Sequence, residues 1–130
     1  MTIARGQGSS QIVLKVRGDR AYVLVEGEPR GDDVIDVVRA GLDQGVLHGN
    51  MRTLVDLTGF IGSVDWPAIQ TVRRMTRQQG DSDARVAYVV RNNLFAPLIR
   101  IVEALFSHSR HRTFHTYTEA IAWLDSDEPE

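Results

Sequence analysis

Two short polar stretches carry the side chains best suited to chemistry in this chain. The first holds Asp56, Thr58, Gly59, Ser63 and Asp65, and the second holds Arg91, Asn92 and Asn93. Each follows an apolar run typical of a buried strand, so both are expected at the carboxyl ends of strands, where ligands of open α/β sheets collect. A phosphate or carboxylate would bind the free backbone amides at the start of the helix that follows the second stretch, with Arg91 beside it. The alternative is that four of these residues cap helices, which is their commonest role at a helix start; they are Ser63, Asp65, Asn92 and Asn93. In that case Asp56 anchors its loop as a hydrogen-bond acceptor.

A group of three histidines, His108, His111 and His115, is the other candidate site. A zinc site needs a fixed tetrahedral ligand set, and these residues span a predicted helix end, a loop and a strand, with no cysteine or local carboxylate to complete it. We therefore predict no metal and interpret the segment as a solvated basic loop. Arg73 and Arg77 lie one helical turn apart, which is typical of the wet face of an amphipathic helix.

The sequence holds no recognisable catalytic pattern. It has no cysteine, which excludes disulfides and thiolate nucleophiles. It also has no G-x-S-x-G, Walker or G-x-G-x-x-G pattern. We therefore predict a protein that is not an enzyme and has no cofactor.

Length and charge restrict the class of protein. At 130 residues the chain is the size of one domain. We predict a disordered tail over 1–10, one domain over 11–124 and an acidic tail over 125–130. A net charge of -2 argues against a nucleic-acid partner. No run approaches the roughly 18 apolar residues of a transmembrane segment, so we expect a cytoplasmic protein. Lys15 is the only lysine among 15 basic residues, a bias typical of G+C-rich bacterial genomes.

Hydrophobic periodicity predicts an α/β fold. Alternation predicts a hairpin over 11–17 and 20–27, with Ile12, Leu14 and Val16 on one face of its first strand. The remaining elements alternate, which implies parallel strands joined by right-handed crossovers. They are a helix over 32–45 with Gly45 as its stop, a strand over 52–59, a helix over 66–80, a strand over 84–90, a third helix from 94, a strand over 112–117 and a closing helix with a Thr116–Glu119 capping box. The prediction is a mixed, mostly parallel five-stranded sheet with about four helices.

The third helix has an unusually wide apolar surface. Its apolar residues include Leu94, Phe95, Leu98, Ile101, Val102 and Leu105. Trp66 is predicted to pack in the core or at its rim and is included in the same candidate apolar site. A helix apolar over much of its circumference must bury more than one face. Two interpretations stand: a homodimer contact, or a pocket for a lipophilic molecule between this helix and the sheet.

Three stretches together resemble a known family. They are LVDLTGF at 54–60, VAYVVRNNLFAPLIRIVEALF at 86–106 and RTFHTYTEAIAWL at 112–124. They resemble the SpoIIAA-like family of bacterial proteins, which belongs with the STAS domains and is similar to Sec14-type lipid-binding domains. The resemblance implies a STAS-like α/β fold.

The resemblance also implies two kinds of activity, neither of them enzymatic. STAS domains of the antagonist type bind protein partners and are switched by phosphorylation of a serine, whereas the Sec14 similarity implies a small lipophilic ligand. The stretch that matches the switch reads GFIGSVDWPAI and makes Ser63 the candidate phosphorylation site, although the paired serines and following glycine of the family pattern are absent. We expect a STAS-like regulatory module that acts through protein–protein interaction, with a lipophilic-ligand binder as the alternative.

Overall fold

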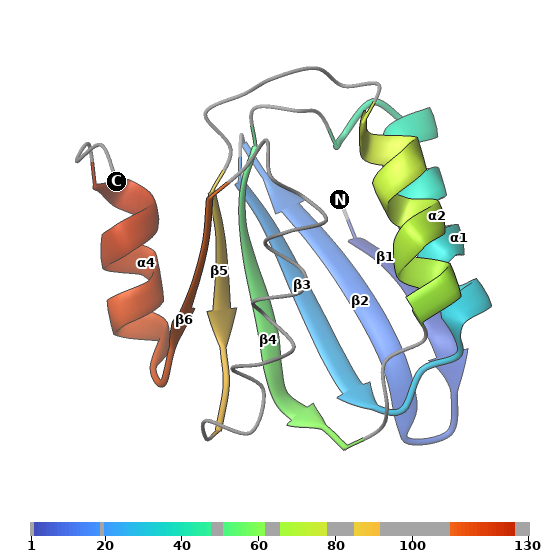
Figure 1. The fold of residues 1–130 in the computed structure, drawn as a ribbon, viewed down its shortest axis with the longest axis horizontal. Coiled ribbons are helices and arrows are strands. Elements are labelled where there is room, and N and C mark those ends of the chain that lie inside the picture. The colour runs from blue at the N-terminus through green and yellow to red at the C-terminus, as the bar shows by residue number, and fades with distance from the viewer. Residues whose placement is uncertain are drawn as a thin grey trace.

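Six strands form one mixed sheet in which spatial order follows chain order (Figure 1). The computed structural model describes residues 2–18, 20–47, 51–61, 66–77, 85–91 and 110–126. The strands are β1 (Thr2–Gln7), β2 (Ser10–Arg17), β3 (Arg20–Gly27), β4 (Arg52–Phe60), β5 (Arg85–Val89) and β6 (Arg110–Phe114). The pairs from β1 to β3 are antiparallel, and the pairs from β3 to β6 are parallel.

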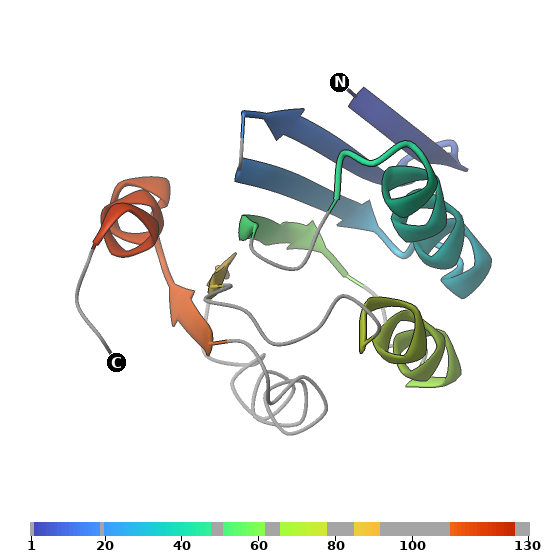
Figure 2. The same cartoon turned by 90° about the horizontal axis from the view of Figure 1, so that it is seen from above.

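The helices divide unequally between the two faces of the sheet. Helices α1 (Gly31–Asp43) and α2 (Trp66–Arg77) lie on one face, and α4 (Tyr117–Asp125) lies on the other (Figure 2). Strands β3, β4 and β5 are parallel neighbours in chain order, so right-handed crossovers must place α1 and α2 on the same face. We call the two faces the α1 face and the α4 face. Among the described elements, α4 alone covers the α4 face.

The hairpin and helix α1 form one core cluster on the α1 face. Ile12, Leu14 and Ala21 point to this face and pack with Val37 of α1, which confirms the predicted alternation. Helix α1 ends as its sequence predicts: Gly45 has a φ of 71°, and its amide donates to Leu42. The next amide, that of Val46, donates to Gly41, which completes a Schellman motif.

Helix α4 is fixed at its start by a side-chain cap. The hydroxyl oxygen of Thr116 accepts a hydrogen bond from the amide of Glu119 at 3.2 Å, and the hydroxyl donates to the carboxylate of Glu119 at 3.0 Å. These contacts confirm Thr116 as the N-cap that the capping-box spacing predicted. Its apolar side chains pack on β4 and β5, where Leu54, Ala87 and Leu124 belong to one buried cluster.

The last turn of α4 is held by arginines from the beginnings of three parallel strands. Arg20 forms an ion pair with Asp125, Arg52 donates to the carbonyl of Leu124, and Arg85 donates to the carbonyls of Trp123 and Ser126 at 2.8 and 2.6 Å. The carbonyl groups of a final helical turn have no partner within the helix, and they lie at the negative end of its dipole. The guanidinium groups of Arg52 and Arg85 donate hydrogen bonds to these carbonyl groups, and their positive charges interact favourably with the negative end of the helix dipole. Arg85 is only 2% exposed, so its contacts with α4 are made inside the core.

Two sequence predictions about the sheet were wrong. The described sheet has six strands, whereas five were predicted. The additional strand, β1, lies in the segment that was predicted to be a disordered tail. It pairs with β2 from Thr2 opposite Lys15 to Gln7 opposite Ser10, and Ile3 is buried against the core. A single buried apolar residue in a small, polar segment gave too little periodicity to reveal a strand. In addition, β6 begins at Arg110, whereas its predicted start was residue 112. The prediction missed the first residues of this strand because they are basic and give no hydrophobic signal.

The arginine contacts with α4 predict a large loss of stability for Arg85→Met. This change removes the donor to two carbonyl groups in the core, and we expect it to lower the free energy of unfolding by about 2–4 kcal/mol. Urea denaturation monitored by tryptophan fluorescence would measure the loss. The control is Arg17→Met at an exposed position of β2, which should change stability by less than about 0.5 kcal/mol. Equal effects of the two variants would contradict the role assigned to Arg85.

Candidate functional site

Helix α4 packs on β4, β5 and β6 and leaves the hairpin part of its own face open (Figure 2). The cross-strand register identifies the residues there, since Lys15 lies opposite Tyr22 and Val13 lies opposite Leu24. We call Val13, Lys15, Arg17, Tyr22 and Leu24 the open face. Lys15 and Arg17 are exposed, and the other three are half-buried.

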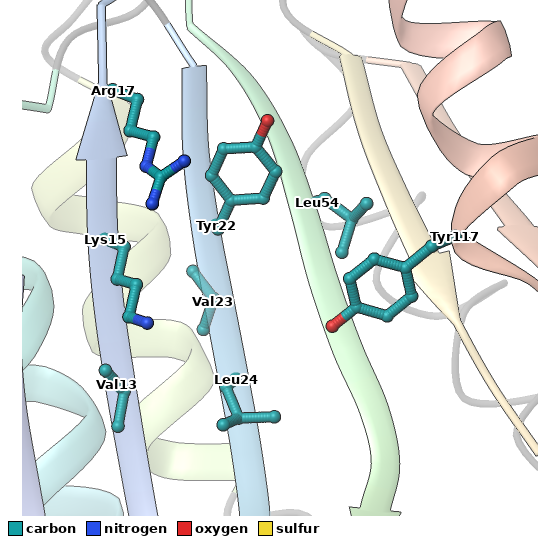
Figure 3. Close-up of a pocket in the computed structure, with 8 residues that line it drawn as sticks. All are labelled: Val13, Lys15, Arg17, Tyr22, Val23, Leu24, Leu54 and Tyr117. Carbon is teal, nitrogen blue, oxygen red and sulfur yellow. The ribbon is translucent and has the colours of Figure 1, made fainter.

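A hollow of about 330 Å³ lies between the open face and α4 (Figure 3). Tyr22 lies beside Leu54 in the register of β3 and β4, and Tyr117 reaches across from the first turn of α4. The lining residues are Val13, Lys15, Arg17, Tyr22, Val23, Leu24, Leu54 and Tyr117. The hollow therefore combines apolar side chains with two cations and two phenol groups.

The charges of the open face are arranged along the strands. Lys15 and Arg17 lie toward the end of the sheet at which β3 and β4 begin, and neither forms an ion pair with any residue that the structure describes. At the opposite end, Gln11 donates a hydrogen bond to Glu26 at 2.6 Å. One end of the open face is thus basic, and Gln11 and Glu26 border its other end with one carboxylate.

Asp56 ties the start of α4 to β4 at the edge of the hollow. It is 7% exposed, and one carboxylate oxygen accepts from the amide and hydroxyl of Thr58 at 2.9 and 2.6 Å. The other oxygen accepts from the hydroxyl of Tyr117. Burial raises the pKa of Asp56, but the hydrogen bonds from Thr58 and Tyr117 favour the carboxylate more strongly and lower the pKa below its ordinary value. Burial and the hydrogen bond to Asp56 raise the pKa of Tyr117.

The residues predicted to form a site at the strand ends are only partly placed. Asp56, Thr58 and Gly59 lie within β4, which continues to Phe60, so they are strand residues rather than loop residues. Arg91 is exposed two residues after the end of β5. The other predicted members of this site lie outside the described residues; they are Ser63, Asp65, Asn92 and Asn93.

The predicted apolar site falls almost wholly outside the described part of the chain. Trp66 is described and is the half-buried first residue of α2. The positions that the structure does not describe are Leu94, Phe95, Leu98, Ile101, Val102 and Leu105.

The described histidines make different contacts. Nδ1 of His111 lies 2.9 Å from the hydroxyl oxygen of Tyr88, with the two rings stacked, and Nδ1 of His115 lies 3.2 Å from the carbonyl oxygen of Val90. No group of three potential metal ligands is found within the described ranges. No described helix is long and apolar enough to span a membrane.

Sequence reasoning missed the residues that line the hollow. The outward positions of the predicted hairpin hold Lys15, Arg17 and Tyr22, and Tyr117 lies between the two predicted capping residues, Thr116 and Glu119. The available signal was that Val13, Tyr22 and Leu24 are apolar or aromatic at positions that alternation assigns to the solvent side. A hairpin with such residues on both faces is expected to cover something on both.

A family match covers most of the chain. The family model described as SpoIIAA-like matches residues 20–125. No curated protein matches the chain.

The contact between Asp56 and Tyr117 predicts a pH-dependent effect of Tyr117→Phe. Loss of the hydroxyl should destabilise the protein by about 1 kcal/mol at pH 7, where the carboxylate is charged. Because the folded pKa of Asp56 is lowered, this difference should shrink as the pH falls below about 4 and through the folded value. Urea denaturation from pH 3 to pH 7 would measure it.

A second titration and a control sharpen this test. Because the pKa of Tyr117 is raised in the folded state, the wild-type protein should also lose stability as the pH rises above about 10, and the variant should lose less. Thr118→Val, at the exposed neighbouring position, should follow the wild type at every pH. A pH-independent difference between wild type and Tyr117→Phe would contradict the contact.

Proposed function

The chain belongs to the SpoIIAA-like family, and we propose that this STAS-like module is not an enzyme and acts by binding a protein partner. The observation that carries the proposal is the open face. Helix α4 covers only part of its side of the sheet and leaves Val13, Tyr22 and Leu24 beside a hollow. Partly exposed apolar side chains gathered beside a hollow are typical of sites of interaction.

The pattern of the hairpin supports a covered surface rather than a solvated one. Antiparallel strands with one face in water usually alternate between apolar and polar residues. Here the inward residues Ile12 and Leu14 are buried against α1, and the outward Val13 and Leu24 are apolar as well. A face that stays in water permanently has no need of these side chains.

The state of Asp56 supports a binding role over catalysis. It is the buried carboxylate among the described residues, and both of its oxygens accept hydrogen bonds from Thr58 or Tyr117. A general base must reach a proton on its substrate. Asp56 instead serves as a fixed acceptor that positions α4.

Site-specific photocrosslinking in the cells that carry this gene tests the proposal. Benzoylphenylalanine would replace Tyr22 on the open face, Ile61 after β4 or Asp36 on α1. Tyr22 is the closest match in shape, Ile61 is 83% exposed beside the predicted strand-end site, and Asp36 is the exposed control. We expect a covalent adduct of protein size at position 22 or 61 and none at position 36.

Two results would contradict a protein-binding function. One is the absence of any protein adduct at positions 22 and 61 under conditions in which the probe reacts. The other is a native mass that exceeds the denatured mass by the size of a lipid, without any protein adduct. The second result would favour the lipophilic-ligand alternative.

A further inference from the structure

We propose that the open face receives one acidic amphipathic helix of the partner, laid beside α4. This deepens the proposed function and rests on it. The carboxylates of that helix meet Lys15 and Arg17, and one of its apolar side chains enters the hollow.

The width of the uncovered surface fits a single helix. Strands β1, β2 and β3 span two interstrand spacings, which is roughly 10 Å, and an α-helix with its side chains is about 10 Å across. Helix α4 already packs on the neighbouring strands of the same face. A second helix beside it would complete the layer and bury Val13 and Leu24.

The charges specify an acidic occupant. Three other cations on this face are engaged with α4, since Arg20 pairs with Asp125, and Arg52 and Arg85 donate to carbonyls of its last turn. Lys15 and Arg17 have no ion-pair partner among the described residues. Complementary carboxylates would fix the position of the incoming helix and steer its approach.

The polarity of the face also sets the direction of the occupant. Glu26 lies at the far end of the open face from Arg17, where it accepts from Gln11. Acidic residues of the incoming helix are therefore expected near the N-terminal ends of β3 and β4. Neutral or basic residues are expected near Glu26.

The geometry argues against two other occupants. A second copy packed on this face with its strands parallel would bring Lys15 and Arg17 of one chain toward the same residues of the other, and like charges repel. With its strands antiparallel, the copy would bring one carboxylate, that of Glu26, toward the two cations. A bilayer is flat on this scale, whereas the hollow is flanked by α4 on the same face (Figure 3). A rod-shaped segment reaches the hollow, and a flat surface does not.

Two designed peptides test the proposal on the full chain. Each has about 18 residues, long enough to form a helix, with leucine on one face and either glutamate or lysine on the flanks. Nuclear magnetic resonance titration should show the glutamate peptide shifting the amide signals of Val13, Lys15, Tyr22 and Leu24, and the lysine peptide leaving them unchanged. Because Lys15 is the only lysine in the chain, the glutamate peptide should also protect its side-chain amine from acylation.

Matched charge reversals identify the cations responsible. Lys15→Glu with Arg17→Glu should weaken binding of the glutamate peptide by about tenfold or more. The control is Arg5→Glu with Arg39→Glu, which makes the same change in net charge. Arg5 lies opposite Ile12 and so belongs to the α1 face, and Arg39 is exposed on α1. This control should stay within about twofold of the wild type.

Three results would overturn the proposal. One is equal binding of both peptides, or equal weakening by both pairs of substitutions. Another is a set of shifts at the open face caused by phosphatidylglycerol vesicles and not by the glutamate peptide. The third is concentration-dependent shifts of the same residues without peptide, which would make a second copy the occupant. A protein adduct at position 61 together with any of these results would remove this inference and leave the proposed function standing.

Discussion

The agreement between strand order and chain order is the constraint on which the rest of this structure depends. Since β3, β4 and β5 are parallel neighbours in sequence, right-handed connections place both crossover helices on one face. A fold whose strand order reversed would have helices on both faces. Among the elements that the structure describes, the opposite face is left to α4, a nine-residue helix that is too narrow to cover a six-stranded sheet. The open face is therefore a consequence of topology before it is a matter of side chains.

The place of α4 on this face is set by polar contacts at its two ends. At its start, the Thr116 cap and the hydrogen bond from Tyr117 to Asp56 fix the first turn against β4. At its end, Arg85 and its neighbours bind the final carbonyl groups. Apolar packing alone is not directional and would allow the helix to slide along the sheet. The polar contacts remove that freedom, so the position of α4 beside the hollow is as well defined as that of the strands that line it.

Much of the fold could be predicted from local signals, and much of the site could not. The alternation in the hairpin, the stop at Gly45 and the cap at Thr116 each depend on residues close in sequence, and the structure confirms them. Strand β1 was missed because its pairing with β2, rather than its own pattern, makes it a strand. The contacts of Arg85 and the hollow were missed for a related reason. They depend on the register of strands far apart in sequence, which no local pattern encodes.

Lys15 and Arg17 have two effects on the open face, and both follow from their position at its edge. In the free protein, exposed cations beside an apolar patch keep it hydrated and discourage contact with an identical patch. Toward an acidic helix the same cations are attractive, because the desolvation of an edge charge is small and its field extends into solvent. Lys15 and Arg17 therefore oppose contact between two identical open faces and favour contact with an acidic helix, without any change of conformation. Arg20, one strand away, contributes neither effect because its charge is paired with Asp125.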